Sequence, residues 1–203
     1  MVKKFVFLST VAASVLTLTV ASAVNAHIVI EGFKGRAGYN EFLTLMVPHG
    51  CGPEATTEIR MKIPVGIAPA VPEQKGGWET QVIMRKLDEP IRGEGGRVMS
   101  EVVDEFVWKG NLPSNQLGTF KFLARMPTEI GSVVAFKTIQ KCGEKEDRWV
   151  EVIEEGQEPW EMWVNPEPAP FVEIVEPTGP QLGATMQQLG AARQAKMQDA
   201  GRE

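Results

Sequence analysis

Apolar and polar residues alternate along several short segments between residue 40 and residue 155. The clearest apolar positions are Leu43, Leu45 and Val47 in one segment and Ile59, Met61 and Ile63 in another. A period of two places successive side chains on opposite faces of a strand, so each segment is predicted to be a β-strand with one buried face.

Similar segments recur at 78–84, 102–108, 119–124, 133–141 and 148–153. Stretches rich in Gly, Pro and charged residues separate them, at 48–53, 64–77, 93–96, 111–118 and 143–147. Seven or eight short strands at this spacing predict an all-β fold, an antiparallel β-sandwich of two packed sheets.

The composition changes after Gly156. Prolines are frequent over 159–180, which predicts an extended strap against the domain, with one edge strand at 171–175. Over 181–198, apolar residues recur at roughly helical spacing, which predicts a short amphipathic helix; a disordered tail is the alternative. We therefore divide the mature chain into a domain at 27–176 and a tail at 177–203.

The first 26 residues have the features of a secretory signal peptide. Lys3 and Lys4 precede a long apolar run, and Val24 and Ala26 suit the −3 and −1 positions of signal peptidase. We expect cleavage before His27; an uncleaved membrane anchor is the alternative. After cleavage no remaining segment is apolar for long enough to span a membrane, so the sequence predicts a soluble, periplasmic protein.

Charge and cysteine content narrow the function classes. The formal net charge is −5, which argues against nucleic acid as a partner. The chain has two cysteines, Cys51 and Cys142, and export to an oxidising compartment predicts that they form a disulfide. Two thiolates binding a soft metal are the alternative, although no C-x-x-C spacing supports it.

Cleavage before His27 would create a metal-binding group. The free amine and the imidazole Nδ1 of an amino-terminal histidine can close a six-membered chelate ring on one ion, and copper(II) favours such nitrogen ligands. The amine must lose its proton to bind, which is inexpensive near neutral pH because its ordinary pKa is about 8. His49 is the second histidine of the chain, and it is either a further imidazole ligand or a turn residue beside the disulfide.

Several short motifs, in this order and spacing, resemble the YcnI-like family of exported copper-binding proteins. They are the start at 26–30, Val-Pro-His-Gly-Cys-Gly at 47–52, the strand at 56–64, Gly-Gly-Trp at 76–78, Phe-Lys-Thr-Ile-Gln-Lys-Cys-Gly at 136–143, Trp149 and Pro-Glu-Pro-Ala-Pro at 166–170. The resemblance covers most of 27–175. It implies an immunoglobulin-like β-sandwich with copper(II) bound by a single-histidine brace.

In this resemblance the brace maps onto His27. A glutamate that completes the site maps onto Glu58, with Glu54 as the alternative, and a tryptophan close to the metal maps onto Trp149, with Trp78 as the alternative. The residues themselves leave other roles open. Glu58 can be a solvated residue on the polar face of its strand, and a tryptophan can be ordinary core packing.

Three functions follow from these observations. The first, which we favour, is a copper(II) chaperone or buffer without turnover, which exchanges the ion with another periplasmic copper carrier or a membrane copper transporter. The second is a copper-dependent oxidase or monooxygenase, which would need His49 as an additional ligand. The third is a metal-free, disulfide-stapled module that binds another protein. The methionines, including Met162 between Trp160 and Trp163, are interpreted as packing.

Overall fold

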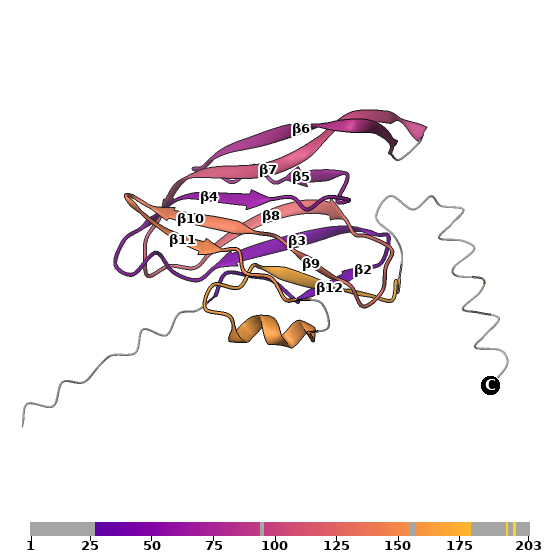
Figure 1. The fold of residues 1–203 in the computed structure, drawn as a ribbon. Coiled ribbons are helices and arrows are strands. Elements are labelled where there is room, and N and C mark those ends of the chain that lie inside the picture. Colours follow the sequence, from indigo (N-terminus) through magenta and orange to yellow (C-terminus); the bar gives the residue numbers. More distant parts are fainter. Residues whose placement is uncertain (1–26, 94–95, 155–156, 180–193, 195–196, 198–203) are drawn as a thin grey trace, which may run out of the picture.

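Three β-sheets make up the computed structural model, which describes residues 27–93, 96–154, 157–179, 194 and 197 (Figure 1). The first sheet has the order β1 (Val29–Ile30), β3 (Asn40–Val47), β8 (Gly118–Arg125), β5 (Ala70–Pro72). The second has the order β11 (Lys145–Trp149), β10 (Thr138–Cys142), β4 (Thr56–Lys62), β7 (Val98–Leu112), β6 (Glu79–Arg92). The third has the order β2 (Lys34–Arg36), β12 (Phe171–Val175), β9 (Val133–Ala135).

The first and second sheets pack against each other through the alternating apolar residues. Leu45 of the first sheet and Ile59 and Met61 of the second are fully buried in one core. Aromatic rings join the two layers, as where Phe106 meets Phe122 with ring centroids 6.0 Å apart. The predicted antiparallel sandwich is confirmed, because one apolar face on each strand is enough to form the core between two sheets.

The predicted strand at 133–141 is two strands in the structure. β9 belongs to the third sheet and β10 to the second, and the chain changes sheets at Phe136 and Lys137. The backbone N–H of Phe136 donates to Pro170, whereas the carbonyl of Lys137 accepts from Lys62. The sequence pattern of 133–141 does not reveal this break, because no Gly or Pro interrupts the segment between the two strands.

The strap after residue 156 also differs from the prediction. β12 is not an edge strand but the middle strand of the third sheet, parallel to β2 and antiparallel to β9. A 3₁₀ helix, η2 (Pro159–Val164), interrupts the extended chain before it and lies beside β12 (Figure 1). The side chain of Met162 is fully buried there against Ala169 and Phe171, in a second, smaller core.

The predicted signal peptide at 1–26 lies outside the described residues. The same holds for the predicted helix at 181–198, except Gln194 and Met197, which have helical backbone. Within the described part of the chain, no helix has the length and apolar character needed to cross a membrane.

Candidate metal site at His27

The ring of His27 contacts two tryptophan rings. His27 is half-buried and lies two residues before β1, and the side chains of Ile28 and Ile30 next to it are buried in the main core. The ring of Trp149 meets it edge-on, with centroids 5.9 Å apart and planes at 61°. The ring of Trp163 is stacked on it, with centroids 5.7 Å apart and planes at 16°. The fold therefore holds the residue that would begin the mature chain at a defined place.

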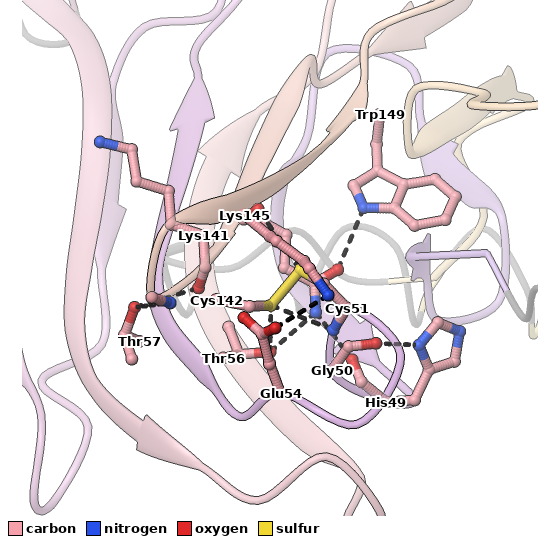
Figure 2. Close-up of a disulfide and its surroundings, with 12 residues drawn as sticks. His49, Gly50, Cys51, Glu54, Thr56, Thr57, Lys141, Cys142, Lys145 and Trp149 are labelled. Atoms are coloured by element: carbon pink, nitrogen blue, oxygen red, sulfur yellow. Dashed lines mark hydrogen bonds and ion pairs between the residues drawn. A yellow bond between two sulfur atoms is a disulfide. The ribbon is translucent and has the colours of Figure 1, made fainter.

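One part of this site, which we call the Trp149 wall, consists of Trp149 and the residues hydrogen-bonded behind it, Gln140, Thr56 and the backbone of His49. Figure 2 shows Trp149 with the neighbouring disulfide. Trp149 ends β11 and is 3% exposed, and its Nε1 donates to Oε1 of Gln140 at 3.1 Å. The Nε2 of Gln140 donates to the carbonyl of His49 and to Oγ1 of Thr56, both at 2.7 Å. Gln140 is fully buried, and these bonds satisfy its amide, so the network holds the indole in one orientation.

The disulfide between Cys51 and Cys142 supports the same wall (Figure 2). It joins the loop after β3 to the end of β10, two residues beyond Gln140, with the Cα atoms 5.9 Å apart. Both cysteines are buried. The predicted disulfide is confirmed, and such a bond is typical of proteins from oxidising compartments.

A second part of the site, which we call the Trp163 wall, is formed by η2 and by the aromatic residues next to it, Phe33 and Phe171. Trp163 is 39% exposed, and its ring also contacts Phe33 at 5.2 Å and Phe171 at 5.9 Å between centroids. From the sequence, this part of the strap was expected to contribute packing only. In the structure the strap places an indole against His27, more than 130 residues away along the chain.

The structure does not bring Glu58 to His27. Glu58 lies on the outward face of β4, and its carboxylate forms ion pairs with Lys141 at 3.2 Å, Arg60 at 3.5 Å and Lys109 at 3.9 Å. Trp149, in contrast, packs on the inward side of the same sheet. The mapping of the carboxylate ligand onto Glu58 is therefore not supported, because alternation along β4 turns this side chain away from the core.

The contacts of Glu54 and Trp78, the two alternatives, are with residues other than His27. The carboxylate of Glu54 pairs with Lys145 at 2.8 Å beside the disulfide (Figure 2). Trp78 packs edge-on against Phe120 at 4.9 Å and lies over Gly110, where a side chain would collide with the indole. Of the two candidate tryptophans, Trp149 is thus the one that meets the ring of His27.

His49 is connected to the Trp149 wall through its backbone. Its carbonyl accepts the bond from Gln140, and its Nδ1 lies 2.6 Å from the carbonyl of Gly50. Because a carbonyl oxygen only accepts, Nδ1 of His49 carries the proton in this contact. This matches a turn histidine beside the disulfide, the simpler of the two roles considered for it.

The donor set at His27 suits a chelate built on one residue. Among the described residues, no group of three or more His, Cys, Asp or Glu side chains gathers in a way that could hold a metal. No hydrogen bond within the described part of the chain engages the ring nitrogens of His27. After cleavage before His27, the imidazole and the freed amine would supply two nitrogen donors from one residue, a pair that suits the nitrogen preference of copper(II).

Gln140 is the other residue that sequence reasoning missed. It lies between Thr138 and Cys142 on the buried face of β10, and all three are fully buried. A polar amide at an inward position of an alternating strand was the available signal, because a buried amide needs specific partners.

Comparisons with known proteins agree with the fold. A family model described as "Domain of unknown function (DUF1775)" matches residues 27–174. A solved structure titled "Crystal structure of an uncharacterized protein from Nocardia farcinica reveals an immunoglobulin-like fold" is similar, with a TM-score of 0.53 and 20% identity over 73% of this chain and 98% of that chain. No curated protein matches. The immunoglobulin-like fold is thus confirmed.

Proposed function

This chain belongs to the DUF1775 family, and on that premise we propose that it is an exported copper(II)-binding protein whose ion is held at an amino terminus created by cleavage before His27. The observation that carries the proposal is the contact of the His27 ring with both Trp149 and Trp163. An ordinary first residue of a domain would extend into solvent. Here the histidine is held against the domain.

The proposed ligands are the amine and Nδ1 of His27. Copper(II) is the proposed ion because it favours nitrogen ligands such as the two in this chelate ring. Glu58 is not part of this proposal, because its carboxylate lies on the outward face of β4 among three cationic side chains. Trp149 contributes by contact, as a rigid apolar wall beside the imidazole.

We place the protein in copper homeostasis as a carrier or buffer that exchanges the ion with another periplasmic copper carrier or a membrane copper transporter. A site at a chain terminus, in contact with one buried and one partly exposed tryptophan, is reachable by a partner. The buried disulfide supports export, since it is typical of proteins that function in oxidising compartments.

The test compares three forms of the mature protein: one that begins at His27 with a free amine, the same protein with an acetylated amine, and a His27→Phe variant. Copper(II) affinity is measured by competition with a chelator, and electron paramagnetic resonance counts the bound nitrogens. We expect both altered forms to bind about 100-fold more weakly, which corresponds to about 2.7 kcal/mol. Equal affinity of the free and the acetylated forms would refute the brace.

A further inference from the structure

The ring of Trp163 is more nearly parallel to the imidazole of His27 than the ring of Trp149 is. The indole of Trp163 and the imidazole of His27 are nearly parallel, at 16°, whereas Trp149 meets the same ring at 61°. The rings of Trp163 and His27 have centroids 5.7 Å apart, which is an offset-stacked arrangement. The rings of Trp149 and His27 form an edge contact instead.

The strap and the turn between β1 and β2 both hold Trp163 in this position. Met162, the residue before it, is fully buried against Ala169 and Phe171. Phe33 meets the edge of the Trp163 ring with planes at 82°, and Phe33 has the unusual backbone φ of 54°. A non-glycine residue in this left-handed region is maintained only when its surroundings determine it, so this contact is part of a specified arrangement.

The start of η2 adds a further restraint. Glu158 and Glu161 form a capping box, in which the side chain of Glu161 accepts the backbone N–H of Glu158 at 2.6 Å. A six-residue 3₁₀ helix has little stability of its own. The cap and the buried Met162 therefore determine which way Trp163 points.

We propose that Trp163 is a positioning residue for the metal ligand, which keeps the imidazole of His27 in one orientation and slows the release of copper. The inference rests on the proposed function, because it assigns a role at the same site. The first residue of a processed chain is attached to the fold on one side only, so its side chain has rotational freedom that must be lost on binding a metal. Stacking removes part of that freedom before the metal arrives.

The experiment compares Trp163→Ala with Trp160→Ala in the correctly processed protein. Trp160 is the matched control, because it belongs to the same η2, is 64% exposed and has no ring contact with His27 among the described residues. We expect Trp163→Ala to weaken copper(II) binding about 3- to 10-fold and to speed transfer of the ion to a chelator by a similar factor. Trp160→Ala is expected to match the parent protein in both measurements.

A measurement without metal tests the stacking itself. The ring current of Trp163 shifts the imidazole proton resonances of His27, and Trp163→Ala should remove most of this shift while Trp160→Ala keeps it. Trp163→Phe, which retains a smaller ring, should give intermediate shifts and release rates; it also serves if the alanine variant disturbs η2. Unchanged resonances, or release rates in both Trp163 variants equal to those of Trp160→Ala, would overturn the inference.

These outcomes separate the two proposals. If the free and the acetylated forms bind copper equally, the brace is refuted whatever the Trp163 variants do. If the acetylated form loses copper while the Trp163 variants behave as the parent, the brace stands and the positioning role is refuted.

Discussion

The two walls around His27 differ in how they are stabilised. The Trp149 wall belongs to the main core, where a buried amide network and a disulfide restrain a tryptophan that is 3% exposed. The Trp163 wall belongs to a small second core, where a short 3₁₀ helix presents a tryptophan that is 39% exposed. The difference indicates a division of roles: the Trp149 wall is coupled to global stability, whereas the Trp163 wall can change locally without unfolding the sandwich.

The largest effect is expected from removing the disulfide that supports the Trp149 wall. The double variant Cys51→Ala/Cys142→Ala should lose about 4 to 5 kcal/mol of unfolding free energy, because the bond closes a loop of about 90 residues in the unfolded chain. Chemical denaturation of the parent and the variant measures this loss. Identical denaturation midpoints in the two proteins would show that the disulfide does not stabilise the protein and so does not make the Trp149 wall more stable than the Trp163 wall.

The next largest effect compares the tryptophans directly. Trp149→Ala should lower the free energy of unfolding by about 3 kcal/mol or more, since it leaves a cavity in the main core. Trp163→Ala should lower it by about 1 kcal/mol, because its partly exposed ring loses mainly aromatic contacts. Urea unfolding of both variants gives the comparison, and equal losses would contradict the difference between the walls.

A smaller effect is expected from the amide network. Gln140→Leu removes the acceptor for Trp149 and the donor to the His49 carbonyl, which should reduce the free energy of unfolding by about 2 kcal/mol. Lys137→Gln is the control, because it alters an exposed side chain nearby on the chain and should change stability by less than about 0.5 kcal/mol. A Gln140→Leu protein as stable as the control would contradict this expectation and would mean that these hydrogen bonds orient Trp149 without stabilising the fold.

The smallest effect is expected outside both walls, at Glu58. Glu58→Gln weakens its ion pairs with three partly exposed cations and should lower stability by about 1 kcal/mol or less. Arg60 keeps a second carboxylate partner, because its guanidinium also donates to Glu105, and this hydrogen bond raises the pKa of Arg60. Copper affinity should be unchanged. A large loss of copper binding would instead restore Glu58 as a ligand.

Much of the fold was predictable from local patterns, and the failures have a common cause. Alternation found the strands of the sandwich, but it did not show that β9 and β10 belong to different sheets or that β12 has neighbours on both sides. Both errors concern the pairing of strands. Pairing depends on which edges meet in space, and the alternation of a single strand does not encode it.

The candidate site divides in the same way. His27 was predicted as a ligand because its chemistry depends on one residue and one cleavage point, and Trp149 was predicted from the family resemblance. Gln140 and Trp163 were missed as site residues. Their roles depend on contacts with residues far away along the chain, which neither spacing nor composition reports.

The sequence by itself determined the all-β class and the disulfide partners, because they follow from local alternation and from the presence of two cysteines. The cleavage that would expose His27 stays a prediction from the sequence. Only the tertiary structure decided that Trp149 and Trp163 both contact His27 and that Glu58 faces the other side of its sheet. The reason is physical: a site is formed where separate elements pack together, and the packing of a sandwich brings the two ends of the domain to the same place.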